Sequence, residues 1–139
     1  MGNRKIKHFI IENKIGELTD MAEKMMELAK QWKLPQAITV NINLAIEEAL
    51  SNIIFYAFPD KGIHEIKVSV MLNNDILRIK ITDDGIPFNP LSQQQPDITL
   101  SAEERPVGGL GIFLISQIMD KMHYTRHKDQ NILTLNKSI

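Results

Sequence analysis

Apolar residues recur at intervals of three and four along two stretches of the first half of the chain. This is the spacing of a helix that buries one side. The first stretch runs from Ile15 to Trp32, and Leu34-Pro35 is expected to end this helix because the residue before a proline avoids the α conformation. The second stretch predicts a longer helix over residues 37–58. Both helices need an apolar surface to cover.

Polar and apolar residues alternate elsewhere, as they do in strands with one buried face. Leu77, Ile79 and Ile81 alternate with charged residues, so we expect this face of the strand to pack on the helices. The Asn pair at 73–74 suits a tight hairpin before it, since Asn tolerates positive φ. The predicted strands span residues 5–12, 64–72, 75–82, 122–128 and 131–137, and a third helix is predicted over 109–121.

Residues 86–107 follow neither pattern. They contain four of the six prolines and three consecutive glutamines, and a loop this long is usually functional or disordered. The resulting order, β-α-α-β-β-loop-α-β-β, predicts an α+β fold. We expect a two-layer α/β sandwich, in which about three helices cover one face of a mostly antiparallel, mixed sheet. The length of 139 residues fits a single domain over residues 1–139.

Composition narrows the function classes. The net charge of −1 gives no electrostatic footprint for nucleic acid or for an anionic membrane. The chain has no cysteine, which excludes disulfides and cysteine-based metal sites. We expect a cytoplasmic protein, because we find neither a secretory signal nor an apolar run near the ~18 residues of a membrane span. The histidines lack metal-ligand spacing and are expected at the surface; they are His8, His64, His123 and His127.

Three short blocks carry candidate chemistry. Glu48 and Asn52 are four residues apart on a predicted helix and so share a face. An Asn carbonyl can ligate Mg²⁺, and a carboxylate nearby could take a proton from a nucleophile that attacks a phosphate. Taken alone, these two residues are explained more simply as a solvated helix surface.

The other two blocks contain glycines. Asp83-x-Gly85 follows a strand, where a carboxylate could accept the exocyclic amine of adenine; a simple Asx turn explains it equally well. The sequence Gly-Gly-Leu-Gly at 108–111 precedes a helix, whose free N–H groups could hold phosphate oxygens. The alternative is a hinge that closes the long loop. Neither block is a Walker P-loop, which requires Gly-Lys-Ser/Thr.

Order and spacing together make the blocks specific. In this order the chain resembles the histidine-kinase-like ATPase superfamily, or Bergerat fold, over nearly its whole length. The blocks match its N box, its first glycine box and its second glycine box, and residues 86–108 match its ATP lid; they are Glu48…Asn52, Asp83-x-Gly85 and Gly109-x-Gly111. Within the superfamily, the Glu-Ala-Leu-Ser-Asn and Asp-Asp-Gly-Ile-Pro-Phe variants are most similar to the stand-alone anti-sigma-factor serine/threonine kinases of bacteria.

This resemblance implies a role for each matching residue. Asn52 would ligate Mg²⁺, and Glu48 would be the general base that activates a serine or threonine hydroxyl on a partner. Asp83 would bind the adenine amine, with Gly85 beside the base. Gly109 and Gly111 would contact the phosphates of ATP. Arg105, at the end of the lid, could neutralise phosphate charge, although no motif fixes it and solvent exposure fits it as well.

Two positions depart from the family pattern. Tyr56 stands where the family often has His, and Gln130-Asn131 stands at the turn where it often has Gly-Thr. The usual Thr helps bind adenine, and Asn131 could substitute for it.

The resemblance implies a kinase that phosphorylates an anti-anti-sigma partner with a STAS domain and sequesters a sigma factor. It also implies a homodimer. The alternative is a non-catalytic module that binds ATP or a sigma factor. An isolated ATPase domain of the histidine-kinase type ranks last, because the chain has no phospho-accepting domain.

Overall fold

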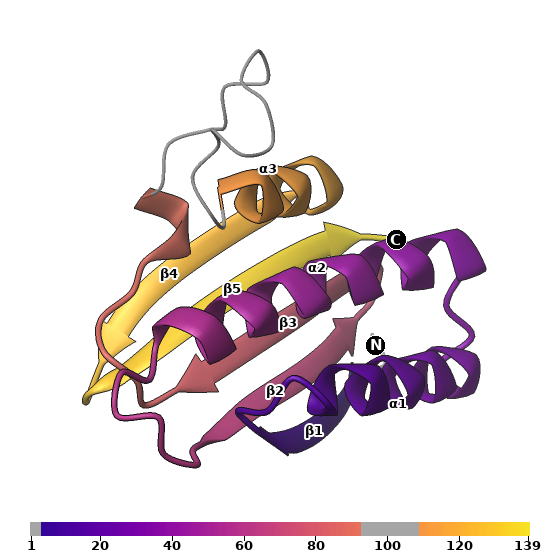
Figure 1. Ribbon diagram of the computed structural model, residues 1–139. Coiled ribbons are helices and arrows are strands. Elements are labelled where there is room, and N and C mark those ends of the chain that lie inside the picture. The colour runs from indigo at the N-terminus through magenta and orange to yellow at the C-terminus, as the bar shows by residue number, and fades with distance from the viewer. Residues whose placement is uncertain (1–3, 93–108) are drawn as a thin grey trace.

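The computed structural model describes residues 4–92 and 109–139, and within these ranges five strands form one sheet in the order β1-β2-β3-β5-β4 (Figure 1). All four strand pairings are antiparallel. The expectation of a mostly antiparallel sheet is confirmed, but the described strands include no parallel pair, so the sheet is not mixed. The predicted succession of strands and helices is confirmed. The strands are β1 (Arg4–Glu12), β2 (Glu65–Asn73), β3 (Ile76–Asp83), β4 (Lys121–His127) and β5 (Gln130–Ser138).

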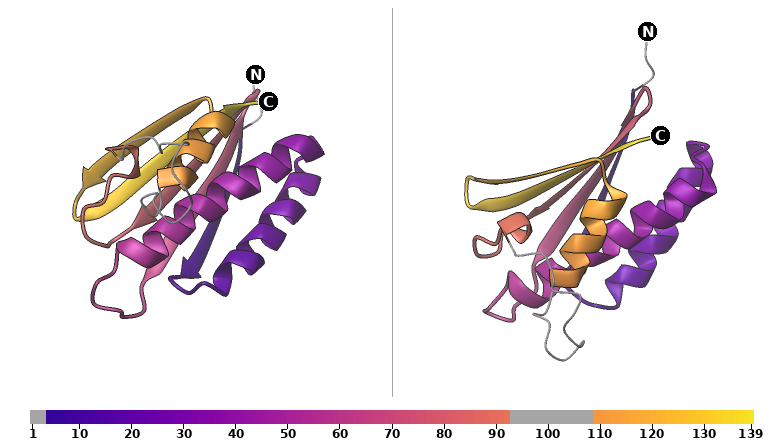
Figure 2. Two further views of the ribbon diagram at one scale, coloured as in Figure 1. Left: turned by 45° about the horizontal axis from the view of Figure 1, so that its top comes forward. Right: turned by 90° about the horizontal axis from the view of Figure 1, so that it is seen from above.

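The helices lie on one face of this sheet. Seen from above, the sheet forms one layer and the helices the other, which confirms the two-layer α+β architecture (Figure 2). A short 3-10 helix, η1, interrupts the expected loop at its start. The helices are α1 (Glu17–Gln31), α2 (Gln36–Tyr56), η1 (Pro90–Ser92) and α3 (Gly109–Ile118).

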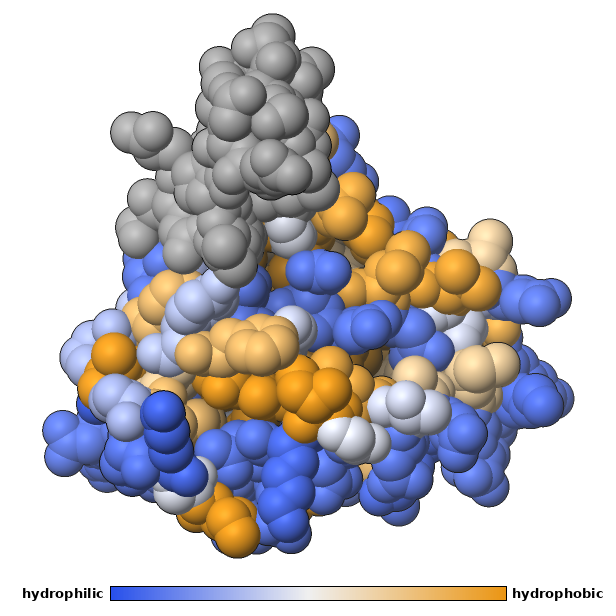
Figure 3. Space-filling model, viewed as in Figure 1, coloured by the Kyte–Doolittle hydropathy of each residue, from blue (hydrophilic) through white to orange (hydrophobic). Residues whose placement is uncertain are grey.

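The core lies between α2 and the central strands. Leu77, Ile79 and Ile81 are at most 1% exposed, so the predicted inward face of β3 is confirmed. By length and composition α2 could cross a membrane, which the sequence reading did not anticipate. In the fold it is the central helix over the sheet, with one side buried in the core and apolar side chains such as Phe55 exposed on the other. Figure 3 shows apolar surface running across this helical face between hydrophilic borders.

Local backbone geometry ends α1 before the proline does. Lys33 adopts a φ of 56°, and Leu34 N–H donates to Ala29 O at 2.9 Å. Lys33 N–H donates to Lys30 O at 3.2 Å, which completes a Schellman motif that caps the helix C-terminus. The helix therefore ends at Gln31, and the expectation that Leu34-Pro35 ends it is wrong.

The last hairpin turns two residues earlier than the sequence suggested. Lys128 and Asp129 have φ values of 50° and 62°, as a two-residue hairpin turn with positive φ at both positions requires. Gln130-Asn131 is therefore not the turn but the start of β5. This shift turns Asn131 inward, opposite Asp83 in the sheet register. The third helix is also shorter than expected, because Asp120 N–H already pairs with Asn136 O of β5 at 2.9 Å.

We predict that Ile79→Ala lowers the free energy of unfolding by about 2–5 kcal/mol, since it removes buried methyl groups and leaves a cavity. The matched control is Ile76→Ala on the same strand, where the side chain is 49% exposed and the expected change is within about 0.5 kcal/mol. Chemical denaturation measures both. Equal losses in the two variants would contradict the assigned strand face.

Candidate functional site

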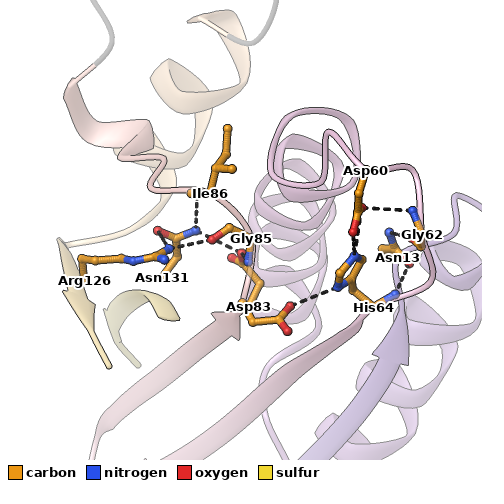
Figure 4. Close-up of polar contacts among 10 residues, drawn as sticks. Asn13, Asp60, Gly62, His64, Asp83, Gly85, Ile86, Arg126 and Asn131 are labelled. Atoms are coloured by element: carbon orange, nitrogen blue, oxygen red, sulfur yellow. Dashed lines mark hydrogen bonds and ion pairs between the residues drawn. The ribbon is translucent and has the colours of Figure 1, made fainter. Parts of the chain in front are cut away.

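Asn131 is the centre of a buried polar cluster where β3 ends and β5 begins. Its side chain is 4% exposed. The amide nitrogen Nδ2 donates to Asp83 Oδ1 at 3.0 Å and to Ile86 O at 2.8 Å (Figure 4). Both amide hydrogens are therefore used to hold the turn that follows β3.

The carbonyl oxygen of the same side chain ties in β4. Asn131 Oδ1 accepts hydrogen bonds from Tyr124 Oη at 2.5 Å, Arg126 Nη1 at 3.2 Å and Phe88 N at 3.2 Å. Arg126 Nη1 also donates to Gly85 O at 2.7 Å. The sequence reading named Asn131 only as a possible adenine contact and missed Tyr124 and Arg126. Their alternation along β4 is the signal that could have placed both on the inner face.

Asp83 is a buried carboxylate with one oxygen engaged. It is 3% exposed, and its Oδ1 accepts from Gly85 N–H at 2.9 Å as well as from Asn131. Burial raises the pKa of the Asp83 carboxyl, against the opposing effect of these two hydrogen bonds. Among the described residues, both hydrogen bonds of this side chain use Oδ1. Oδ2 therefore remains able to accept a hydrogen bond from a ligand.

Gly85 fits a position where no larger residue can stand. A β-carbon there would overlap the carbonyl oxygen of Ala57, just after α2. The next residue, Ile86, donates its N–H to the same oxygen at 2.8 Å. The turn after β3 is thereby packed tightly on the end of α2.

Asn52 brings an unpaired amide to the same region. Its side chain is 6% exposed, and within the described ranges its Nδ2 has no hydrogen-bond partner. A buried polar group without a partner costs about 1–3 kcal/mol, and a ligand can repay that cost. A carboxamide also offers the oxygen that Mg²⁺ prefers. The side chain of Asn52 therefore fits a site that binds Mg²⁺ and phosphate.

Glu48 lies one turn earlier on α2 and faces the start of α3. It is half-buried, and burial followed by the charge of Glu47 raises the pKa of its carboxyl. Gly111 lies directly against it, because a β-carbon at Gly111 would overlap Glu48 Oε2. The fold therefore brings the proposed base to the glycine-rich helix start.

A small cavity of about 20 Å³ lies beside Asp83 and Asn131. Its walls include Asn52, Asp83, Phe88 and Asn131. Ligand pockets usually hold at least roughly 300 Å³, so a base could enter only if part of this wall moved. Phe88, which lines the cavity, stacks on Tyr56 with ring centroids 6.0 Å apart. Tyr56, which replaces the usual family His, therefore supports this wall from behind.

The structure thus brings Asn52, Asp83 and Asn131 to one cavity, and Glu48 to Gly111. Gly109 is the first residue of α3. Arg105 and the part of the expected lid at 93–108 lie outside the described residues. The first part of that lid, residues 86–92, is held at Ile86 and Phe88 by Asn131 and continues into η1.

Comparison with known sequences identifies the family of the chain. Residues 11–137 match the histidine kinase-like ATPase domain, nearly the whole chain. The chain belongs to this family. The membership confirms the resemblance drawn from the three blocks and agrees with the α+β fold.

Within this family, the chain is similar to serine-protein kinases named RsbW. It is 32% identical to the one from Listeria monocytogenes serovar 1/2a over 90 residues, which is 60% of this chain and 57% of that protein. It is 30% identical to the one from Bacillus mycoides over 97 residues, which is 67% of this chain and 60% of that protein. The aligned part thus spans less than two thirds of the length of these relatives.

We predict that Asn131→Ala lowers the free energy of unfolding by about 1–3 kcal/mol, because it leaves the buried Asp83 Oδ1 and the partly buried Tyr124 Oη without their hydrogen bonds to this side chain. The matched control is Asn136→Ala on the same strand, whose side chain contacts the exposed Arg78 and whose loss should stay within about 0.5 kcal/mol. Urea denaturation compares the two. Similar losses would argue against the central position of Asn131.

We predict that Asp83→Asn is at least as stable as the wild type near neutral pH, because the amide keeps Oδ1 as an acceptor and removes a buried charge. The sign follows from the raised pKa. The folded state binds the Asp83 proton more tightly than the unfolded state, so wild-type stability rises as the pH falls through the folded pKa. The advantage of the variant should shrink over the same interval. Unfolding curves between about pH 4 and about pH 8 test this, and a variant clearly less stable at neutral pH would contradict it.

Proposed function

We propose that the chain is an ATP-dependent serine/threonine protein kinase of the anti-sigma-factor type. It phosphorylates an anti-anti-sigma partner with a STAS domain and sequesters a sigma factor. We propose that it works as a cytoplasmic homodimer without direct contact to nucleic acid or membrane. Family membership and the similarity to RsbW serine-protein kinases support this proposal. The observation that carries it is the Nδ2 of Asn52, which has no hydrogen-bond partner among the described residues and lies one helical turn from a Glu48 carboxylate that is against Gly111.

The base and phosphates of ATP have candidate partners in the chain. Asp83 Oδ2 accepts the exocyclic amine of adenine beside Gly85, the position where a backbone approaches closely. Gly109 and Gly111 offer N–H groups at the start of α3 to phosphate oxygens, helped by the helix dipole. Arg105 neutralises phosphate charge. Mg²⁺, held through the Asn52 carbonyl oxygen, supplies further neutralisation when bound.

Glu48 acts on the hydroxyl of the partner protein. Its carboxylate accepts the proton as the hydroxyl oxygen forms a bond to the γ-phosphorus of ATP. The bond between that phosphorus and its bridging oxygen breaks, and ADP leaves. Because burial raises the pKa of Glu48, its carboxylate is a stronger base than a solvated one.

A second candidate function is a non-catalytic binding module. The cavity of about 20 Å³ favours it, because a wall that stays closed would exclude the base. Calorimetric titration with Mg²⁺ and ATP separates the cases. Tight binding without phosphoryl transfer to any STAS partner, or no binding at all, would favour the module.

We predict that Glu48→Gln lowers phosphoryl transfer by about 10²–10⁴-fold and changes the affinity for Mg²⁺-ATP little, because the amide cannot accept the proton. The matched control is Glu23→Gln, which alters an exposed carboxylate on α1 and should transfer at nearly the wild-type rate. Transfer is measured with labelled ATP and candidate STAS-domain proteins, and affinity by calorimetry. If Glu48→Gln transfers as fast as the wild type, Glu48 is not the base.

A further inference from the structure

His64 sits between two carboxylates that come from different parts of the chain. Its Nε2 lies 2.8 Å from Asp60 Oδ2, in the loop between α2 and β2. Its Nδ1 lies 3.3 Å from Asp84 Oδ1, in the turn after β3. The sequence reading expected an ordinary surface histidine, but only 23% of this side chain is exposed.

The rest of the residue is also fixed. The imidazole stacks on the buried Phe58 ring, with centroids 4.3 Å apart and planes 9° from parallel. The backbone N–H donates to Asn13 Oδ1 at 2.8 Å, and the carbonyl accepts from Asn13 N–H at 3.0 Å. The ring therefore has little freedom to leave either carboxylate.

The two carboxylates select a protonation state. A neutral imidazole has one N–H donor, whereas an ionised carboxylate can only accept. The Nε2 contact is a hydrogen bond with Asp60, and the Nδ1 contact is an ion pair with Asp84. Both are favourable only when both ring nitrogens carry a proton. The hydrogen bond with Asp60 and the charge of Asp84 hold the pKa of His64 above its usual value, although burial opposes this.

The position of Asp84 links this contact to the proposed nucleotide site. Asp84 is the neighbour of Asp83 and precedes Gly85, so its side chain anchors the same turn from the side opposite Asn131. Asn131 holds the turn through hydrogen bonds to Asp83 Oδ1 and Ile86 O, and its own amide does not titrate. His64 holds the turn through an ion pair with Asp84 that exists only while the imidazole is protonated.

We propose that His64 is a positioning residue, whose protonated ring holds the Asp83–Gly85 turn in place and makes nucleotide affinity depend on pH near neutrality. This inference rests on the proposed nucleotide site. His64 touches neither reacting atoms nor the residues assigned to Mg²⁺, and it acts through Asp84.

The charged groups around the ring agree with this assignment. Asp60 and Asp84 face the ring. Together with His64 they line a surface groove of about 320 Å³, and Arg126 lines this groove as well. Arg126 is held by Gly85 O and Asn131 Oδ1, so it anchors the turn independently of pH. As the pH rises through the pKa of His64, the imidazolium loses one proton and with it one of its two contacts. The Asp84 contact, at 3.3 Å against 2.8 Å for Asp60, is the longer of the two and is the one expected to be lost.

The experiment measures affinity for an ATP analogue that cannot transfer its phosphate, by calorimetry between about pH 5.5 and about pH 8.5. The phosphates of the ligand titrate in this range, so the readout is the ratio of wild-type to variant affinity at each pH. We expect His64→Asn to bind about two- to fivefold more weakly than the wild type at low pH and equally well at high pH, the scale of an exposed ion pair. Asp84→Asn should reproduce this profile, and the double variant should add nothing further.

His123→Asn is the matched control, because His123 is exposed on β4 and should leave the wild-type profile unchanged. NMR titration of the His64 ring in the full chain gives a second readout, and its pKa should fall in Asp84→Asn. Ratios that do not vary with pH, while the wild type still binds nucleotide, would overturn the role of His64 alone. A wild type that binds no nucleotide at any pH would overturn the nucleotide site and the inference together.

Discussion

The site depends on the hydrogen bonds of one carboxamide, Asn131. Its amide nitrogen donates hydrogen bonds to Asp83 and Ile86. Its oxygen accepts hydrogen bonds from two side chains of β4 and from the backbone N–H of Phe88. A buried amide tolerates unmet hydrogen bonds poorly, so these partners fix one another's positions. The ends of the central strands and the turn after β3 are therefore one polar unit inside an apolar layer.

Asp83 and Asn52, two of the three buried polar residues of the site, differ in how completely their side chains are hydrogen-bonded. Asp83 is charged and buried, but two hydrogen bonds to Oδ1 offset part of the cost. The Nδ2 of Asn52 has no partner within the described ranges. Folding alone gives no reason to keep such a group in the core beside Ile53 and Ala49. Residues that cost stability without a local return are typical of functional sites.

The turn after β3 and the segment that follows it are held differently. Residues 83–85 are packed on Ala57 and anchored by Asn131 and, through Asp84, by His64. Phe88 closes the cavity by stacking on Tyr56 and makes one backbone hydrogen bond to Asn131. Access for a base therefore requires Phe88 to move, while the residues proposed to recognise that base can stay in place.

The strands and helices could be predicted from the sequence alone, because burial of one face imposes a repeat of 2 residues on strands and 3.6 residues on helices. The candidate site residues could be predicted because three short motifs in a fixed order identify the family. Apolar alternation placed Leu77, Ile79 and Ile81 inward without reference to any other element. Only the tertiary structure decided which polar groups meet. The positive φ values at Lys128 and Asp129 moved a turn by two residues and brought Asn131 opposite Asp83. The contact of His64 with Asp84 joins two loops, and no local spacing encodes it, whereas Asp60 is only four residues away in the same loop.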